Sequence, residues 1–466
     1  MRAYTVPLRS MIVKGLRPIE HSLGNGRYLT NSTNLRPCNG GLREANRYTR
    51  SFTLPQDGQI FDCSSGVYVA TKSSIYLYSA GNITSLVSTS VPVKRWSFAD
   101  FGPFILFSNG TINVYRDPVS GEMVLDSLGR FPAFGTICRF RGRVIGGDLS
   151  AEGGSESIVS WSDIGKATFL SSSDLGIARK NTAGSIDIVE VGKVLRIVPL
   201  GTVGVVVYGQ MGIAFLMPVL VDGAAGAMSL KSVLPYGIAS ENAVVSVGDS
   251  HYLLTKYGAV AKLFEKDGRV VVDELDYREF IQSPATAYIS FNGGDFKEII
   301  VGMPTDSPFL LGSSLTISNY GAGTVSSFIQ DCVYSRTGEL IVHSPRPLKQ
   351  LDAMLTSDIL TFDSPGIKEI AQVEILGNIK DSVYVAVSSR VSSSDQFISS
   401  DWRLLNSSGA VSIEAAGTEF KLHVAVIDYT EIFINHIAIT LSYADKRFLK
   451  GARTDYGNKD VAAAGE

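Results

Sequence analysis

The stretch GPFILFSNGTINVYRD (residues 102–117) decides the fold class, because two short runs of apolar and β-branched residues flank Asn109-Gly110. Two such runs separated by a turn dipeptide are typical of a β-hairpin. Asn-Gly suits a type I′ turn, since both residues tolerate a positive φ. The sequence therefore predicts a hairpin that turns at Asn109-Gly110.

The same pattern recurs along the chain, at starts that lie about 35 to 60 residues apart, as a four-stranded propeller blade with loops requires. A single blade cannot bury its own faces, so five or six blades in a ring would share one core. We therefore predict a mainly β protein with an irregular β-propeller over residues 59–345. A two-sheet sandwich with long loops is the structural alternative. The further hairpin-like runs are 65–79, 138–148, 204–217, 251–264 and 297–312.

The whole chain has the composition of a folded protein with more than one domain. It has 466 residues, 45% of them hydrophobic and 19% charged, which excludes wholesale disorder. Its net charge of −3 excludes a chain that is basic throughout, so nucleic acid could be held only by a local patch. The four cysteines contain no CxxC pair, which indicates free thiols in a reducing compartment rather than a zinc knuckle or disulfide scaffold. They are Cys38, Cys63, Cys138 and Cys332.

One uncharged stretch, residues 197–221, is long enough to cross a membrane as a helix. Its six glycines and prolines, and a β-branched run that turns at Gly209-Gln210, favour a β-hairpin instead. We therefore do not expect a membrane span there. Residues 1–14 are interrupted by Pro7, Arg9 and Lys14, so we do not expect a signal peptide either.

The pattern changes in residues 346–450, where we predict a second, smaller domain. In residues 345–357, Leu348, Leu351, Met354 and Leu355 fall on one helical face, which predicts a short helix. Five alternating segments then predict a β-sandwich, and the polar residues 451–466 are expected to form a flexible tail. These segments are 370–376, 382–389, 411–415, 421–428 and 432–442.

Residues 1–58 predict an extended basic arm that packs against another surface. Residues 1–50 hold nine arginines and lysines against two glutamates, a net charge of +7 that leaves −10 for residues 51–466. A basic segment without an apolar period is typical of an interaction arm. The arginines that we expect to make assembly contacts in this arm are Arg36, Arg43, Arg47 and Arg50.

Motifs for catalysis or for cofactor and metal binding are not apparent, so we expect a protein that is not an enzyme and needs no cofactor. The five histidines lack HxxxH and HExxH spacing, and GxSxG, Walker and strand-coupled GxGxxG motifs do not occur. His423 and His436 fall on neighbouring predicted strands and could approach each other, although histidines that merely pack in a sheet are commoner. The acidic residues Asp273, Glu274 and Asp276 are expected in a solvated turn.

The segment SWSDIGKATF (160–169) resembles the Asp box of sialidase propellers, with Asp163 and Gly165 in place. Trp161 stands at the expected serine position, Phe169 comes one residue late, and the box occurs only once. In sialidases the box is structural, and their arginine clamp cannot be assigned here. Arg139, Arg141 and Arg143 alternate, which predicts a row on one face of a strand. We expect this row to contact another subunit rather than a substrate.

Taken in order, five short segments make the chain resemble the tail nozzle or tail accessory (head-completion and stabilisation) proteins of short-tailed, lambdoid-type bacteriophages. They span nearly the whole chain: Asn34–Pro37 with the following glycine pair, Cys138–Arg143, Ile158–Asp163, Gly204–Gly209, and Ser393–Asp395 ahead of Trp402.

The resemblance implies a structural protein of the virion, made in the host cytoplasm. Members of this family form a hexameric ring below the portal and adaptor proteins, enclose the channel through which DNA leaves, and dock spikes, fibres or needles. Such a subunit would contact its own copies, adaptor or portal proteins and, transiently and without specificity, the exiting DNA. The acidic balance outside the arm suits a channel that does not retain phosphates.

Two other functions stay open at the level of sequence. A carbohydrate-binding or sialidase-like propeller would need clustered aromatic side chains and converging polar groups in a concave face. A tail-tip adhesin would share the β architecture and would need long exposed loops, for which residues 148–182 and 217–230 are the candidates. The small apolar segment 218–229 is also a candidate gate.

Overall fold

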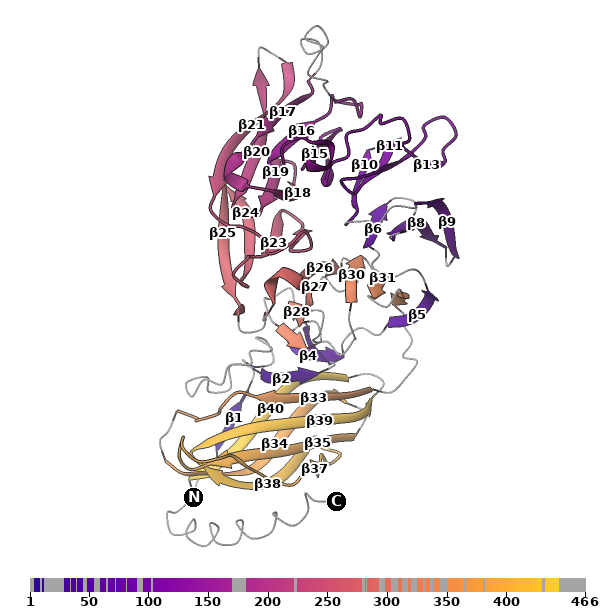
Figure 1. Cartoon of the computed structure of the whole chain (residues 1–466). Coiled ribbons are helices and arrows are strands. Elements are labelled where there is room, and N and C mark those ends of the chain that lie inside the picture. Colours follow the sequence, from indigo (N-terminus) through magenta and orange to yellow (C-terminus); the bar gives the residue numbers. More distant parts are fainter. Residues whose placement is uncertain are drawn as a thin grey trace. The chain divides into compact units, whose positions relative to one another are not determined.

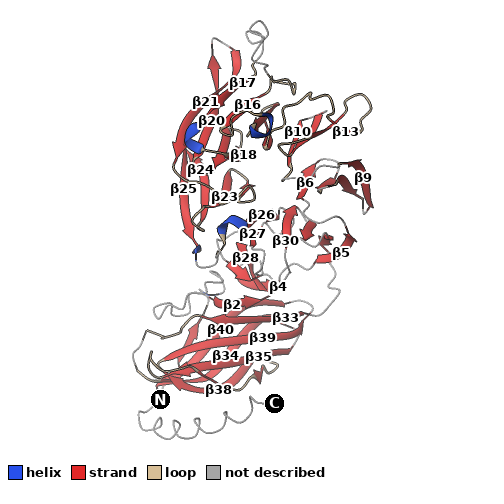
Figure 2. Cartoon of the chain, in the orientation of Figure 1, coloured by secondary structure: helices blue, strands red, loops and turns tan. Residues whose placement is uncertain are grey.

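The structure is a computed structural model in which β-strands account for most of the described residues (Figure 2). The three short helical segments with described bounds are the 3-10 turns η1 (Ser150–Glu152), η2 (Val189–Val191) and η4 (Pro284–Thr286). None of the described residues form a helix long and apolar enough to span a membrane. The structure describes residues 4–8, 11, 29–33, 35–38, 40–44, 48–53, 59–63, 66–71, 73–80, 82–89, 95–101, 104–169, 182–221, 224–278, 281, 283–292, 298–302, 309–311, 317–319, 325–329, 332–335, 339–343, 351–363, 366–379, 382–429 and 432–443.

The chain divides into two compact units, which we call the propeller unit and the sandwich unit. The propeller unit comprises Tyr48–Pro308 and Ala322–His343, and the sandwich unit comprises Met1–Arg47, Phe309–Gly321 and Ser344–Glu466. This division differs from the boundaries predicted from the sequence, because residues 1–58 are shared between the two units. Residues 309–321, which we assigned to the propeller, belong to the sandwich unit.

The propeller unit is built from antiparallel four-stranded sheets that follow one another along the chain (Figure 1). This confirms the predicted mainly β, propeller-like fold. A further pair of strands, β26 (Tyr288–Asn292) and β27 (Glu298–Gly302), forms a hairpin in the same unit. The strands of the first five sheets are β6 (Gln59–Cys63), β7 (Gly66–Ala70), β8 (Ser74–Ser79), β9 (Asn82–Ser88); β10 (Ser97–Phe101), β11 (Phe104–Ser108), β12 (Asn113–Arg116), β13 (Met123–Leu125); β14 (Thr136–Phe140), β15 (Arg143–Gly147), β16 (Ile158–Trp161), β17 (Gly184–Asp187); β18 (Val194–Leu200), β19 (Gly204–Gly209), β20 (Ile213–Val221), β21 (Ala224–Leu234); and β22 (Val244–Val247), β23 (Ser250–Leu254), β24 (Val260–Lys266), β25 (Arg269–Asp276).

The last sheet of the propeller unit combines strands from distant parts of the sequence. Strands β30 (Val325–Ile329), β31 (Cys332–Ser335) and β32 (Glu339–His343) are joined by β5 (Tyr48–Thr53), which pairs with β32. The first strands of successive sheets also contact one another, from β10 through β14, β18, β22 and β26 to β30, and β30 contacts β6. The sheets therefore form a ring, and β5 ties its last sheet to the start of the propeller.

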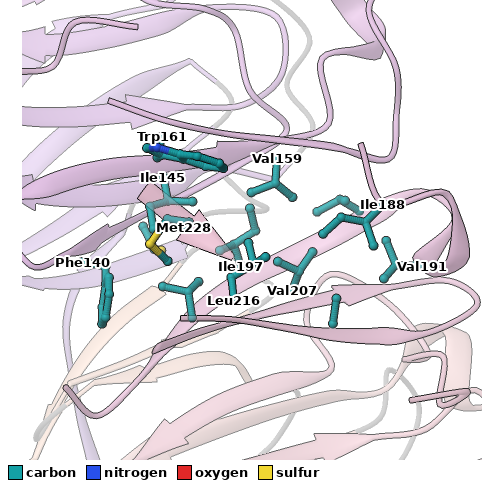
Figure 3. Close-up of a cluster of buried hydrophobic side chains, with 14 residues drawn as sticks. Phe140, Ile145, Val159, Trp161, Ile188, Val191, Ile197, Val207, Leu216 and Met228 are labelled. Carbon is teal, nitrogen blue, oxygen red and sulfur yellow. The ribbon is translucent and has the colours of Figure 1, made fainter. Parts of the chain in front are cut away.

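The hydrophobic cores lie between adjacent sheets, as expected when each sheet buries its faces against its neighbours. One core joins the β14–β17 sheet to the β18–β21 sheet, with Ile145 and Trp161 on one side and Ile197, Val207 and Leu216 on the other (Figure 3). Another joins the first two sheets through Phe61, Tyr68, Trp96 and Phe107. Fully burying one such aliphatic or aromatic side chain stabilises the folded state by about 1.5 to 3 kcal/mol.

The predicted hairpin at Asn109-Gly110 is present, but its turn is displaced by one residue. The backbone N–H of Asn109 donates to the Ile112 carbonyl, so Gly110 and Thr111 are the central residues. Gly110 has a φ of +80°, whereas Asn109 does not have a positive φ. Asn109 serves the turn through its side chain, since its Oδ1 accepts the N–H groups of Thr111 and Ile112.

The stretch 197–221 forms strands β18 to β20 rather than a membrane helix, as the sequence predicts. β19 pairs with both neighbours, and Gln210 and Met211 lie in the turn before β20. The segment 217–230, which we considered as an exposed loop, is largely the paired end of β20 and β21. The candidate gate, residues 218–229, therefore belongs to these paired strands. Residues 222–223 within it lie outside the described residues.

The sandwich unit contains two sheets, and its strands alternate between buried and solvent-facing residues, as strands with one covered face do. The predicted sandwich is therefore confirmed. One sheet has the order β3-β4-β40-β34-β38, with β1 on β40; the other runs β28-β29-β2-β33-β39-β35-β36, with β37 on β35. The strands are β1 (Tyr4–Pro7), β2 (Leu29–Thr33), β3 (Leu35–Cys38), β4 (Gly41–Glu44), β28 (Phe309–Leu311), β29 (Ile317–Asn319), β33 (Leu351–Ser357), β34 (Lys368–Ile379), β35 (Ser382–Arg390), β36 (Ile398–Ser399), β37 (Arg403–Leu404), β38 (Ala410–Gly417), β39 (Glu419–Tyr429) and β40 (Ile432–Tyr443).

The helix predicted over residues 345–357 is wrong, because residues 351–357 form strand β33. This strand pairs with β2 on one side and β39 on the other, so its backbone groups find partners in the sheet. Ala353 and Leu355 are buried with the period of two that a strand requires. Leu348, which contributed to the helical pattern, lies outside the described residues.

The described residues of the segment 1–58 do not form a separate arm. Where the structure describes them, they are extended, but they pair with strands of the same chain: β1 and β4 with β40, β2 with β33, and β5 with β32. The sequence identified the extended conformation correctly, whereas the partner surface belongs to this chain itself. The predicted flexible tail, residues 451–466, lies outside the described residues.

Candidate functional site

The three arginines 139, 141 and 143 do not form a row on one strand. Arg139 lies on β14, Arg141 and Gly142 form the turn, and Arg143 begins β15 opposite Phe140. Arg141 has a φ of +44° and Gly142 a φ of +75°, so the chain reverses between the arginines. The prediction failed because Arg-Gly was read as part of a continuous strand.

Each of these arginines makes a contact within the propeller unit. The exposed Arg139 donates to the carbonyl of Asp100 and the exposed Arg141 to the carbonyl of Thr202, at 3.2 and 2.9 Å. Arg143 is only 3% exposed, and burial lowers the pKa of its guanidinium, an effect that the Asp163 charge opposes. Arg143 is therefore a structural residue, and only Arg139 and Arg141 remain candidates for assembly contacts in this group.

Of the four arginines of the N-terminal segment expected to make assembly contacts, three lie on described strands. Arg36 is on β3 and Arg50 on β5, while Arg47 lies outside the described residues. Arg43 on β4 is half-buried, with its guanidinium carbon 4.9 Å from the centre of the Phe433 ring. This cation–π contact uses Arg43 inside the sandwich unit.

The segment that resembles an Asp box forms a turn held by Asp163. Its Oδ1 accepts hydrogen bonds from the Ile164 N–H, the Thr182 N–H and the Thr182 hydroxyl. Gly165, with a φ of +74°, donates its N–H to the Gly142 carbonyl, and the Phe169 ring packs at a tilted angle against that of Phe134. Asp163 thus joins two loops, a structural role like that of the box in sialidases.

The outer face of the sheet containing β35 and β39 gathers aromatic and basic side chains. Paired residues of neighbouring strands lie on the same face, as do residues two apart on one strand. Tyr384 pairs with Leu404 and Ala425, so Leu404 shares a face with His423 and Ile427 of β39. We call this surface the outer face; it comprises Tyr384, Arg390, Phe397, Trp402, Leu404, Lys421, His423 and Ile427.

Two cations of the outer face lie over one aromatic ring. The Arg390 guanidinium is 4.4 Å and the Lys421 ammonium 4.6 Å from the centre of the Phe397 ring. Arg390 also forms a salt bridge with Glu419. These contacts hold the basic side chains in fixed positions on the sheet.

His423 lies at the centre of a chain of hydroxyl groups on this face. Its Nε2 is 2.7 Å from the Ser388 hydroxyl, which is 2.7 Å from the Ser399 hydroxyl. Its Nδ1 is 3.1 Å from the Thr356 hydroxyl, and the Trp402 ring lies beside the imidazole. Burial, followed by the charge of Lys421, lowers the pKa of His423. The imidazole is therefore held neutral at physiological pH.

This arrangement is better suited to binding than to nucleophilic catalysis. Ser388 is 3% exposed, so its hydroxyl is not accessible to a substrate. Trp402 and Leu404, in contrast, are 46% and 53% exposed. Exposed tryptophan, tyrosine and arginine side chains are typical of protein interfaces.

The predicted approach of His423 and His436 does not occur, because β39 and β40 belong to different sheets of the sandwich. Among the described residues, no group of three or more potential ligands is placed to bind a metal. Asp273, Glu274 and Asp276 lie on strand β25 rather than in a turn, and Glu274 pairs with Arg278. Cys63 and Cys138, the cysteines with described side chains, are free thiols.

Sequence reasoning did not identify the outer face as a site. In the sequence, Trp402 is part of the resemblance to the phage tail proteins, and His423 is considered only as a residue that could approach His436. Phe397 and Trp402 lie in a polar segment, SSSDQFISSDW (392–402), where aromatic residues are unusual. Two aromatic residues in an otherwise polar segment are the signal in the sequence that indicates an exposed binding surface.

Comparison with known proteins does not assign the chain to a family. No family model matches the chain, and neither does any curated protein. Solved structures that resemble it include PorZ, an essential bacterial surface component of the type-IX secretion system of Porphyromonas gingivalis, at 10% identity and a TM-score of 0.39, over 69% of this chain and 44% of PorZ. Another is the extracellular domain of a protein from B. thetaiotaomicron described as a hybrid two-component system, at 10% identity and a TM-score of 0.43, over 83% of this chain and 59% of that one. The chain thus spans about half the length of these proteins, and at this identity the likeness concerns the fold alone.

Proposed function

We propose that the chain is a structural subunit of the tail of a short-tailed bacteriophage, a nozzle-ring subunit below the portal and adaptor proteins. Copies of the subunit would surround the channel through which DNA leaves the virion and would dock spike, fibre or needle proteins. The resemblance of the segments quoted above supports this identity. A ring of sheets in which each sheet packs against its neighbours also suits a rigid building block.

The outer face of the sandwich unit is the observation that carries the proposal. Trp402, Leu404 and Ile427 are 46%, 53% and 42% exposed, and they lie on one face among Arg390, Lys421 and Tyr384. An exposed apolar surface bordered by polar residues marks a site of protein association. A ring of identical subunits needs a surface of this kind that meets a different surface of the next copy.

The propeller unit offers the second type of surface that such a ring requires. Arg139 and Arg141 are exposed, and each donates to a backbone carbonyl at the surface of the propeller unit, where a neighbouring copy could also contact the guanidinium group. Arginine is well suited to this role because it presents five donors in one plane.

Imaging of single particles tests the proposal directly. The purified full-length chain would be examined alone and mixed with portal and adaptor proteins, and we expect six-fold rings in the mixture. A chain that stays monomeric in every mixture would count against a ring subunit. Rings whose lumen is lined by lysine and arginine would contradict the part of the proposal that concerns DNA passage.

A carbohydrate-binding role is the second candidate, and one observation favours it. Trp402 lies beside His423, whose imidazole is linked to the hydroxyls of Ser388, Ser399 and Thr356. An aromatic ring next to polar groups is the composition of a sugar-binding surface. Binding or cleavage of cell-surface glycans by the isolated monomer would favour this function over ring assembly.

A further inference from the structure

The first four strands of the chain complete the sandwich unit by pairing with strands from the C-terminal part of the sequence. β1 and β4 pair with β40, and β2 lies between β29 and β33. We call residues 1–44 the N-terminal segment and β29, β33 and β40 the acceptor strands. Among the described strands of the segment, β3 and β4 alone pair with each other. The N-terminal segment therefore binds in the way that a separate peptide adds strands to existing sheets.

Buried apolar side chains hold the N-terminal segment in place. Five of them are at most 4% exposed: Leu8, Met11, Leu29, Leu35 and Leu42. Leu8 also donates its backbone N–H to the Ile437 carbonyl of β40, at 2.8 Å. Removing the segment would expose the apolar surface that these side chains cover, which is unfavourable in water. The acceptor strands therefore need an N-terminal segment, whichever copy of the chain supplies it.

The fit around Phe433 of β40 makes the acceptor strands selective for this sequence. Arg43 pairs with Phe433, and its guanidinium carbon lies 4.9 Å from the centre of the ring. Gly41 approaches the same ring so closely that a Cβ atom there would overlap it and would lie 2.7 Å from the Ile434 carbonyl oxygen. A glycine and an arginine two residues apart thus fix the register of β4. The segment that fits here is the N-terminal segment of this chain, either its own or that of a second copy.

The charges of the chain favour an encounter between the N-terminal region of one copy and the body of another. Residues 1–50 carry a net charge of +7, and residues 51–466 carry −10. Opposite charges of this size raise the rate at which two surfaces meet. This attraction acts on a second copy as it does within one chain.

The connection that follows the N-terminal segment is short. Three residues, 45–47, separate β4 in the sandwich unit from β5 in the propeller unit. A short connection next to an exchangeable element favours exchange between copies. Exchange also costs little, because the same strand pairs and buried contacts form in both arrangements.

We propose that, when copies of the chain associate, the N-terminal segment of each copy pairs with the acceptor strands of the next copy. β1, β2 and β4 keep the pairing described above, but across two chains. Each copy then donates one surface and receives another, and such head-to-tail contacts can close into a ring. The inference rests on the self-association in the proposed function, but neither on the outer face nor on a role in a tail.

A disulfide between two chains tests the exchange. Thr5 of β1 pairs directly with Thr440 of β40, and their hydroxyl oxygens are 3.1 Å apart. Two full-length chains with different tags, one with Thr5→Cys and the other with Thr440→Cys, would be co-expressed, purified through both tags and oxidised. Cysteines in directly paired antiparallel strands lie within disulfide distance. We expect a covalent heterodimer on a non-reducing gel, at least tenfold above the background.

The matched control uses the other neighbour of Thr440. Gln372 of β34 also pairs with Thr440, but both residues belong to the part of the chain that is not exchanged. Gln372→Cys in one chain and Thr440→Cys in the other should therefore give only the background. The wild-type chain in place of Thr5→Cys measures the background from the native cysteines.

A single chain with both Thr5→Cys and Thr440→Cys checks the geometry. It should form the disulfide whether or not the strands are exchanged, and free thiols in it would contradict the pairing of β1 with β40 and the proposal with it. Rings without the covalent heterodimer would overturn the exchange and leave the ring subunit standing. Covalent heterodimers without six-fold rings would support the exchange and count against a nozzle ring. A chain that never associates would overturn both.

Discussion

The hydroxyl of Tyr208 donates a hydrogen bond to Nδ1 of His251, 2.7 Å away, and thereby joins two adjacent sheets of the propeller unit. The opposite ring nitrogen, Nε2, lies 2.8 Å from the Pro199 carbonyl, which can only accept. Nε2 must therefore carry the proton, and Nδ1 is the acceptor. Both side chains are completely buried, so the structure requires a neutral His251.

Acidification should destabilise the propeller unit through His251. Burial lowers its pKa from 6.5 to about 4, an effect that the hydrogen bond to Pro199 partly opposes. Because the unfolded chain binds the proton more readily, this contribution is complete above pH 6.5 and is lost as the pH falls toward 4. Between pH 7 and pH 5 we expect a loss of about 2 kcal/mol from this residue. Urea unfolding at the two pH values measures it.

His251→Gln is the variant that isolates this effect. It should be less stable than the wild type at pH 7, yet lose about 2 kcal/mol less between pH 7 and pH 5. An identical pH dependence in the wild type and His251→Gln would show that His251 titrates as it does in the unfolded chain.

Phe107→Ala should be among the most destabilising substitutions in the core between the first two sheets. Phe107 is fully buried, and its ring centre lies 4.9 Å from that of Phe98 and 5.4 Å from that of Tyr68. Removing a buried phenylalanine side chain costs about 3 to 5 kcal/mol, because a cavity remains. Phe107→Leu should cost less than half as much in the same urea titration. Equal losses for both variants would mean that contact with the aromatic ring, not buried volume, determines stability here.

Proline substitutions in β5 test whether this strand secures the ring. Thr49 pairs with Val342, and Arg50 pairs with Ile341 of β32. Alternate N–H groups of a strand point to opposite edges, so only one of these two residues donates to β32. One of the variants Thr49→Pro and Arg50→Pro should therefore lose about 3 kcal/mol and the other clearly less. Hydrogen exchange of β32 reports which pairing has opened, and unchanged exchange in both variants would refute the closing role of β5.

Trp402→Ala should weaken self-association without unfolding the sandwich unit. Trp402 is 46% exposed on the outer face, so the fold does not depend on its burial. A central interface residue contributes 2 kcal/mol or more, which corresponds to roughly 30-fold in the dissociation constant. Sedimentation of the full-length chain over a range of concentrations measures the change in self-association. Val119→Ala is the control, since Val119 is 94% exposed in the propeller unit, and an equal effect of both variants would exclude the outer face as the interface.

The sequence was most informative where the local pattern and the final structure agree. The runs around Asn109-Gly110 and Gly209-Gln210 became hairpins, because β-branched residues and turn residues favour the same local conformation that the sheets stabilise. The same reasoning failed for residues 351–357, whose spacing fits a helix as well as a strand. There the pairing of β33 with β2 and β39 decides the structure, and those partners are far away in the sequence.

The candidate sites were less predictable than the fold. The outer face joins residues of β35, β37 and β39 through strand pairing, and no spacing within one segment reveals that Leu404 lies on the same face as His423. Arg139, Arg141 and Arg143 show the reverse case, in which a regular spacing suggested a surface row. A positive φ at Arg141 reverses the chain, and burial then removes Arg143 from the surface.

The pairing of β5 with β32 has a consequence for synthesis on the ribosome. Residues 48–53 emerge before any complete sheet, whereas their partner at residues 339–343 emerges after all the other sheets of the ring. At usual elongation rates this delay is roughly 15 to 60 s, during which the nascent strand has no native neighbour. We therefore expect the newly made chain to depend on protection by chaperones until translation has passed His343.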